Sequence, residues 1–191
     1  MPALAPAAPP TDSELIEEIL GGRLDAYDEL MGRYERHVYK TSWGFGGSHE
    51  NAMDLSQAVF LKAYRRLGSF EGRSGFKTWL MKIAYNEGVS WLRSNRRHVQ
   101  GRESFEGDFG KLAAAPSTPD QEMQQLQKEQ QRILLGGLGR LSRRYRTALV
   151  LRYLHGLSVR EVASVLECSE GTAKNVLFRG VRNLRKEVVR A

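Results

Sequence analysis

Apolar residues recur every three or four positions along most of the chain, the spacing that places them on one face of an α-helix. No run alternates apolar and polar residues over the length of a half-buried β-strand. The pattern therefore predicts an all-α protein. Helices are expected at about residues 13–20, 24–44, 50–68, 75–97, 119–135, 142–155, 159–166 and 170–189.

Two stretches lack this periodicity and divide the chain. Residues 98–119, HVQGRESFEGDFGKLAAAPSTP, are rich in Gly, Ala, Ser and Pro and are expected to form a flexible linker. Residues 1–11 have the Pro/Ala composition of a disordered tail. Two small helical domains remain, at 12–97 and 120–191. In the second, the glycines of GGLGRL at 136–141 are expected to form a flexible joint.

The segment LSVREVASVLECSEGTAKNVLFRG, residues 157–180, predicts two short helices joined by a tight turn. Ser158 can cap the first helix, and Glu161 completes an S-x-x-E capping box. Ser169 can cap the second helix after the break at Glu167. This arrangement is typical of a helix-turn-helix, although two helices at a tight turn also occur in plain bundles.

The outward face of the second helix has the chemistry of a DNA reader. Cations can hold phosphates, Asn and Arg can contact base edges, and an apolar group can touch a thymine methyl. An alternative for the aromatic ring of this face is that it folds back over the edge of the core. The residues expected to contact a DNA duplex are Thr172, Lys174, Asn175, Phe178, Arg179 and Arg182.

Charge changes the picture because the basic residues are gathered into blocks. The chain has 29 Lys and Arg against 22 Asp and Glu, a net charge of +7. Residues 70–102 contain 7 basic and 2 acidic side chains, and residues 140–191 contain 12 and 4. An acidic stretch at 103–139 separates the blocks. A merely soluble protein can also be basic, but this segregation favours a polyanionic partner.

Other kinds of site find little support in the sequence. No run reaches the roughly 20 apolar residues of a membrane span, so no membrane insertion is expected. The single cysteine excludes an internal disulfide framework and fits a reducing cytoplasm. The four histidines lack ligand spacing, which argues against a metal site. With no phosphate-binding loop and no catalytic triad, we expect no enzyme, no cofactor and no small-molecule substrate.

The N-terminal domain carries two further outward faces. In the helix at 50–68, Asp54 and Gln57 share a face with Leu61, which indicates a protein contact unless it is one of the single exposed leucines that are common on surfaces. In the helix at 75–97, the outward face mixes cations with aromatic and amide groups, which suits single-stranded DNA unless it is simply solvated. With the preceding loop, this face presents Phe70, Arg73, Ser74, Thr78, Lys82, Tyr85, Asn86, Val89 and Arg93.

Two stretches of the sequence resemble one protein family. YRTALVLRYLHGLSVREVASVLECSEGTAKNVLFRGVRNLRK is similar to region 4 of bacterial sigma factors of the extracytoplasmic-function class, which binds the promoter −35 element. DLSQAVFLKAYRRLGSFEGRSGFKTWLMKIAYN is similar to their region 2. The resemblance implies a sigma factor that binds core RNA polymerase and directs transcription initiation. The alternative is a stand-alone helix-turn-helix regulator, which leaves the N-terminal faces without a role.

The resemblance also implies roles for particular residues. Region 2 docks on the clamp helices of polymerase, which assigns polymerase binding to Asp54, Gln57, Phe60 and Leu61. It assigns −10 DNA binding to Phe70, Arg73, Ser74, Lys82, Asn86 and Arg93, with Phe70 and Asn86 enclosing a flipped base. Core RNA polymerase and promoter DNA are the implied partners, in the cytoplasm and at the nucleoid when bound. The resemblance leaves open an anti-sigma factor as a further partner.

At four positions the chain departs from the family pattern. Met53 and Ala58 replace acidic residues of the polymerase face, so the electrostatic part of that contact is expected to be weaker. Gly88 replaces the usual Ala and is expected to loosen its helix by up to ~1 kcal/mol. Glu167 stands in the helix-turn-helix turn where members usually have Gly.

Overall fold

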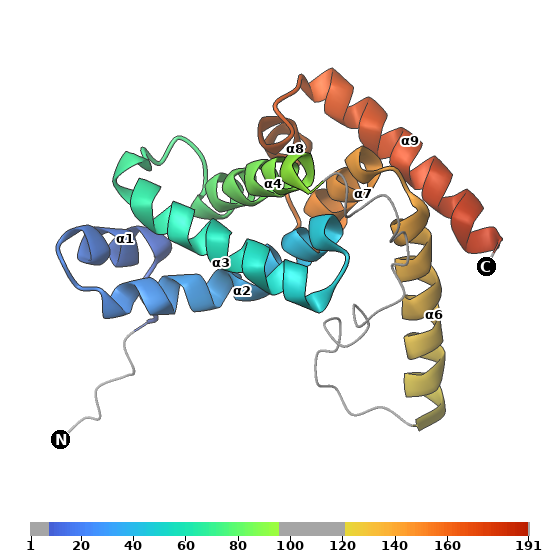
Figure 1. Ribbon diagram of the computed structural model, residues 1–191, viewed down its shortest axis with the longest axis horizontal. Coiled ribbons are helices and arrows are strands. Elements are labelled where there is room, and N and C mark those ends of the chain that lie inside the picture. Colours follow the sequence, from blue (N-terminus) through green and yellow to red (C-terminus); the bar gives the residue numbers. More distant parts are fainter. Residues whose placement is uncertain (1–7, 96–120, 191) are drawn as a thin grey trace.

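The N-terminal half of the chain is a helical bundle in which α2, α3 and α4 pack on one another (Figure 1). In this computed structural model, residues 8–95 and 121–190 are described, and their regular elements are all helical, without a strand. The prediction of an all-α fold is confirmed. The elements of this half are α1 (Asp12–Leu20), α2 (Asp25–Gly46), α3 (His49–Arg66), the 3₁₀ turn η1 (Leu67–Ser69) and α4 (Phe76–Ser94).

The C-terminal half begins with a long helix and ends in a second one that crosses it (Figure 1). A single π-helical turn, η3, continues α7 toward the helix-turn-helix. The expected linker at 98–119 and residues 1–7 of the expected tail lie outside the described residues. The elements of this half are α6 (Gln121–Arg140), α7 (Arg143–Leu149), η3 (Val150–Leu154), α8 (Val159–Val165) and α9 (Glu170–Val189).

Side-chain caps fix the two helices of the helix-turn-helix where the sequence places them. The Ser158 hydroxyl accepts the Glu161 amide at 3.2 Å, and the Glu161 carboxylate accepts the Ser158 amide at 2.8 Å. The Ser169 hydroxyl accepts the Thr172 amide at 3.2 Å, which caps α9. These bonds satisfy amides that a helix leaves free at its start. The predicted capping box and the predicted cap of α9 are confirmed.

The prediction of a flexible joint at 136–141 is wrong, because α6 runs through all three glycines of this segment to Arg140. Gly137 is buried, and a Cβ atom there would lie 3.1 Å from side-chain carbons of Leu184 and Val188 on α9. A larger side chain would require the Leu184 and Val188 side chains to shift. The glycine therefore serves close packing of α6 on α9 instead of bending the chain.

Gly88 has a packing role that its helix propensity does not reveal. It is buried in α4, and a Cβ atom there would lie 2.4 Å from the ring of Phe45 on α2. Such an approach is far shorter than any real carbon contact, so only glycine lets this ring lie against the α4 backbone. The loss of helix propensity is thus coupled to a close contact between α2 and α4.

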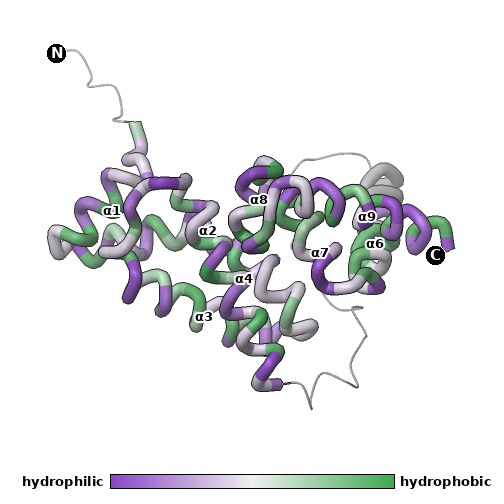
Figure 2. The backbone as a smooth tube through the Cα atoms, turned by 90° about the horizontal axis from the view of Figure 1, so that it is seen from above, coloured by the Kyte–Doolittle hydropathy of each residue, from purple (hydrophilic) through white to green (hydrophobic). Residues whose placement is uncertain are grey.

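The two halves pack directly on each other, which the sequence did not predict. Helix α8 lies against α4, and α7 lies against α2 (Figures 1 and 2). Buried apolar side chains of both halves belong to one contiguous cluster, which includes Leu80 and Met81 of α4 and Val162 of α8. Thr78 was expected on the outer face of its helix but is only 2% exposed. The expectation failed because the C-terminal half covers this end of α4.

Candidate functional site

Helix α9 presents a polar and aromatic stripe to solvent. Ala173, Val176, Leu177 and Gly180 are buried on the opposite side, as the helical pattern predicts. Phe178 is 71% exposed, so its ring does not fold back over the core. The exposed residues of the predicted DNA-binding set are Thr172, Lys174, Asn175, Phe178, Arg179 and Arg182.

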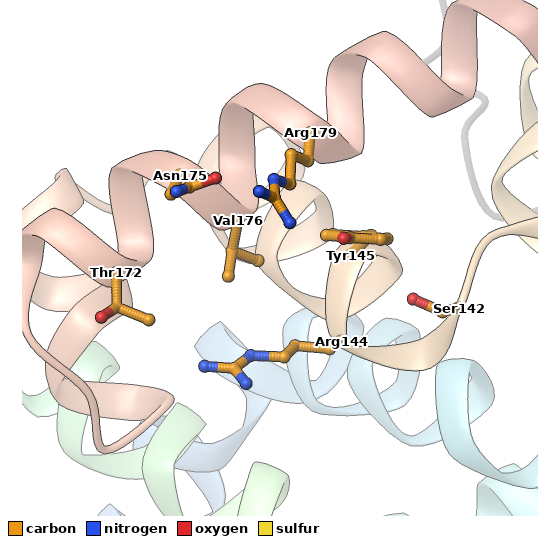
Figure 3. Close-up of a pocket in the computed structure, with 7 residues that line it drawn as sticks. All are labelled: Ser142, Arg144, Tyr145, Thr172, Asn175, Val176 and Arg179. Carbon is orange, nitrogen blue, oxygen red and sulfur yellow. The ribbon is translucent and has the colours of Figure 1, made fainter.

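The stripe borders a hollow of about 350 Å³ between α9 and the start of α7 (Figure 3). Thr172, Asn175 and Arg179 line it from α9, while Arg144 and Tyr145 line it from α7. Figure 3 shows the Arg179 side chain pointing from α9 toward Tyr145, with Arg144 crossing beneath the helix. Two guanidinium groups and the hydroxyl groups of Ser142, Tyr145 and Thr172 around one hollow have the chemistry to hold a phosphate.

Sequence reasoning missed the α7 side of this hollow. The basic run RRYR at 143–146 carried a signal, because cations at the start of a helix beside a helix-turn-helix can reach the DNA backbone. Arg146 in the same run does something else. Its guanidinium donates to the carbonyl oxygens of Leu138 at 2.9 Å and Leu141 at 3.1 Å, so it joins the end of α6 to α7. The structure therefore distinguishes Arg144, which lines the hollow, from Arg146, which is used inside the protein.

The outward face of α3 is exposed as the sequence predicts. Asp54 and Gln57 are exposed beside Leu61, whose side chain is 51% exposed. Phe60 is half-buried, and its carbonyl accepts the Tyr27 hydroxyl at 2.5 Å, so this residue also holds α3 against α2.

Further apolar side chains extend the α3 face. Met53 is 41% exposed and Tyr64 is 43% exposed. Sequence reasoning singled out Met53 as a departure and did not identify Tyr64. The face is therefore more apolar than its two polar residues suggest, which suits a protein contact.

The two residues expected to enclose a base come from different elements, Phe70 from the loop after η1 and Asn86 from α4. The Phe70 ring is half-buried and packs edge-on against Phe76, with centroids 5.6 Å apart, and against Trp79 at 5.4 Å. Asn86 is exposed, seven residues after Trp79, or about 10 Å along a helix.

The cations near α4 differ in their surroundings. Arg73 is exposed and pairs with the neighbouring Glu71 at 2.5 Å, and Arg93 is exposed at the far end of α4. Ser74 is half-buried in the loop before the helix. Lys82 is half-buried, and its ammonium lies 3.4 Å from a carboxylate of the C-terminal half.

Two other kinds of site are missing from residues 8–95 and 121–190. No group of three or more His, Cys, Asp or Glu side chains in these stretches is placed to hold a metal ion. None of the helices described there has both the length and the apolar character needed to cross a membrane.

Family models match both halves of the chain. A model described as Sigma-70 region 2 matches residues 30–98, which include α3 and α4. A model described as Sigma-70, region 4 matches residues 131–184, which include the helix-turn-helix and most of α9.

Named proteins match over nearly the whole chain. The ECF RNA polymerase sigma-E factor of Haemophilus influenzae is 31% identical over 183 residues, or 93% of this chain and 95% of that protein. The RNA polymerase sigma-H factor of Pseudomonas aeruginosa is 33% identical over 175 residues, or 88% and 89%.

Solved structures share the fold. The sigma factor RpoE in complex with the anti-sigma factor NepR, from Bartonella quintana, superposes with a TM-score of 0.63 and 26% identity over 86% of this chain and 96% of that one. CnrH in complex with the cytosolic domain of CnrY gives a TM-score of 0.65 at 21% identity over 92% and 95%.

Proposed function

The chain belongs to the extracytoplasmic-function class of RNA polymerase sigma factors, and on that premise we propose how its surfaces divide the work of initiation. Helix α3 binds core RNA polymerase, α4 with its preceding loop holds the −10 strand, and α9 reads the −35 element. The chemistry of RNA synthesis belongs to polymerase, so the chain itself is not an enzyme. It acts in the cytoplasm, where polymerase works on the nucleoid.

The observation that carries the −35 assignment is the exposed stripe of α9 beside the hollow. Arg179 and Asn175 have side chains that make bidentate contacts to guanine and adenine edges. Lys174 and Arg182 lie on the same exposed stripe and neutralise phosphates. The α9 face is thus suited to a major groove, with base contacts near its middle and backbone contacts around them.

The assignment of polymerase binding to α3 rests on the mixture of polar and apolar groups on its face. Asp54 and Gln57 supply hydrogen-bonding groups, while Leu61 and Tyr64 supply apolar area that water does not favour. Exposed leucine and tyrosine side chains beside a carboxylate form a small docking patch with an apolar centre. Because Met53 and Ala58 stand where the family usually has acidic residues, more of the binding free energy of this contact comes from apolar burial.

We also propose an anti-sigma factor as a partner, a protein that covers surfaces of this chain when it is inactive. The sigma factor RpoE of Bartonella quintana was solved with an anti-sigma factor, and the present chain shares its fold and 26% of its sequence. An anti-sigma factor for this chain would cover the α3 face or the α9 stripe.

The stand-alone regulator is not favoured, because the region 2 match gives the N-terminal half the same family as the C-terminal half. Another alternative is an interaction protein that mimics a sigma factor and sequesters its anti-sigma factor. The basic α9 disfavours it, since such a protein does not need a cationic stripe for DNA binding.

Affinity for purified core RNA polymerase tests the proposal at the α3 face. Leu61→Ala and Asp54→Lys are each expected to weaken association about tenfold, which corresponds to roughly 1.4 kcal/mol. Glu17→Lys is the matched control, because Glu17 is exposed on α1 and is not part of the proposed polymerase-binding face. Circular dichroism verifies the fold of each variant. Wild-type affinity in both α3 variants would contradict the assignment.

A further inference from the structure

One ionisable side chain lies buried between the two halves of the chain and has no part in the proposed function. His155 follows the π-helical turn η3 in the C-terminal half and is only 3% exposed. Its Nε2 atom lies 2.9 Å from the hydroxyl oxygen of Thr41, on α2 of the N-terminal half. Histidine titrates between pH 5 and 8 when its surroundings do not perturb it. The contact between the halves therefore includes a group that can change its charge near neutral pH.

The local backbone buries this histidine and leaves larger side chains outside. The His155 amide donates to the carbonyl oxygen of Val150 at 3.0 Å, the wide bond of a π turn. Beside it, Tyr153 is 66% exposed and Leu154 is 41% exposed. Leucine is usually buried in preference to histidine, so a buried imidazole next to an exposed leucine is an informative reversal. Single π turns are also frequent at functional sites.

A second histidine lies beside the first. The ring centroids of His37, on α2, and His155 are 5.0 Å apart. The Nδ1 atoms of both rings are buried, and neither has a hydrogen-bond partner among the residues that the structure describes. A neutral imidazole has one N–H donor, whereas an imidazolium has two. Protonation in the closed arrangement would therefore add a charge and leave an Nδ1–H group buried without an acceptor, which is costly.

The charges around the two rings oppose protonation further. Burial lowers the pKa of His155, and His37, Lys77 and Lys40 lower it in the same direction. Burial also lowers the pKa of His37, with the same two lysines adding to the effect. Lys77 is held close by its own bond, because its ammonium donates to the carbonyl oxygen of His155. The neutral form of both rings is thus the one that fits the closed arrangement.

The acidic group nearest to these lysines is already occupied. Glu161 of α8 acts on Lys77, but its carboxylate accepts the Thr78 hydroxyl at 2.7 Å and the Ser158 amide at 2.8 Å. It is therefore engaged with other donors and does not balance an imidazolium. The charged groups that α2, α4, η3 and α8 bring to this contact are Arg36, Lys40, Lys77, Arg152 and Glu161.

We propose that His37 and His155 form a proton sensor, which holds the two halves together while both rings are neutral and releases them in acid. Release separates α8 from α4 and α7 from α2, the helix pairs that join the halves. The inference does not depend on which surface binds polymerase or DNA. It concerns the arrangement of the two halves and the condition that changes it.

The direction of the effect follows from linkage between protonation and packing. In the closed arrangement the pKa values of both rings are lowered, whereas after release the rings meet water and titrate near their usual value. The closed arrangement therefore has its full stability above about pH 6.5 and loses it as the pH falls. His155 contributes the larger part because His37 is only half-buried.

Histidine titration by NMR on the full chain tests the sensor. Imidazole signals are followed from pH 7.5 to 5.0 and assigned with His37→Gln and His155→Gln. The His155 ring is expected to become protonated in step with a change in the amide signals of α4 and α8, as the closed population falls roughly tenfold between pH 7.5 and 5.5. A His155 ring that stays neutral over this range, or that is protonated with no change in those amide signals, would overturn the proposal.

Substitutions separate sensing from packing. His155→Gln keeps a polar group for the Thr41 hydroxyl but cannot titrate, so it is expected to stay closed at pH 7.5 and to lose most of the response to acid. His49→Gln, at an exposed position on α3, is the matched control and is expected to keep the whole response. If His155→Gln opens the halves already at pH 7.5, His37→Gln takes its place and is expected to reduce the response. An undiminished response in the variant that stays closed would show a purely structural histidine and overturn the sensor.

Discussion

Arg144 at the start of α7 and Arg179 in the middle of α9 line one hollow, although 34 residues separate them in the chain. Two helices thus bring cations to the same edge of the helix-turn-helix, one beside the base-reading stripe and one within it (Figure 3). We assign the first to the DNA backbone and the second to base edges, and the difference can be measured.

Arg144→Ala is expected to weaken binding to all duplexes alike. Loss of one phosphate contact should reduce the slope of log affinity against log salt by about one unit. Fluorescence anisotropy over a range of salt concentrations measures both quantities. A loss confined to one base position would instead make Arg144 a base reader.

Arg179→Ala is expected to flatten the preference at one or two −35 positions, since a bidentate base contact supplies roughly 1–3 kcal/mol of discrimination. Lys174→Ala is the comparison, because it should weaken every sequence equally. Binding to a library of singly substituted −35 duplexes separates these results. If both variants keep wild-type affinity, preference and salt dependence, α9 is not the reader.

Phe70→Ala and Asn86→Ala are expected to slow open-complex formation without weakening initial duplex binding. Flipping a base out of the stack costs a few kcal/mol, which contacts with the protein must offset. We assign these contacts to Phe70, before α4, and to Asn86, on α4. A pre-melted bubble template should largely restore the rate. Equal defects on bubble and duplex templates would show that neither residue acts at strand opening.

Acid is expected to separate the two halves of the chain, which in the closed state pack through α8 on α4 and α7 on α2. Burial, together with His37, Lys77 and Lys40, lowers the pKa of His155 to about 3 in the closed state. In the open state the pKa returns toward its usual value near 6.5. Closure therefore has its full stability above pH 6.5 and loses it as the pH falls. From pH 7.5 to 5.5 the closed state loses about 1.4 kcal/mol, or roughly tenfold in population.

Spin labels at Ser90→Cys on α4 and Ser164→Cys on α8, both exposed positions, in a Cys168→Ser background report the distance between the halves across this pH range. His155→Gln, which has no imidazole to titrate, is expected to remove most of the dependence. The pKa of His37 is also lowered by burial, so a small residual dependence of the same sign should remain. A distance distribution that is unchanged at pH 5.5 would contradict this account of the contact between the halves.

Local features of the fold were predictable because they depend on neighbours in the chain. The caps at Ser158 and Ser169 and the outward stripe that includes Phe178 follow from side-chain type and helical spacing. The sequence could not predict the hydrogen bond from Thr78 to Glu161. The local pattern around each residue does not indicate which surface of the other domain packs against it.

Glycines misled sequence reasoning for a related reason. Gly88 and Gly137 weaken helices by propensity, and the sequence therefore suggested a loosened helix and a flexible joint. In the structure, Phe45 leaves no room for a Cβ atom at Gly88, and side chains of α9 leave little room for one at Gly137. Arg144 was missed because it stands in the same basic run as Arg146, whose guanidinium is used inside the protein.

Transcription in vitro by core RNA polymerase with and without the purified chain, on a set of genomic promoter fragments, tests the central claim most directly. The account predicts discrete start sites that appear only when the chain is added. It also predicts that these transcripts share one pair of −10 and −35 sequences and become weaker with Leu61→Ala at limiting concentrations of the chain. Failure of the chain to produce any specific start, or its action only when another sigma factor is supplied, would contradict the claim.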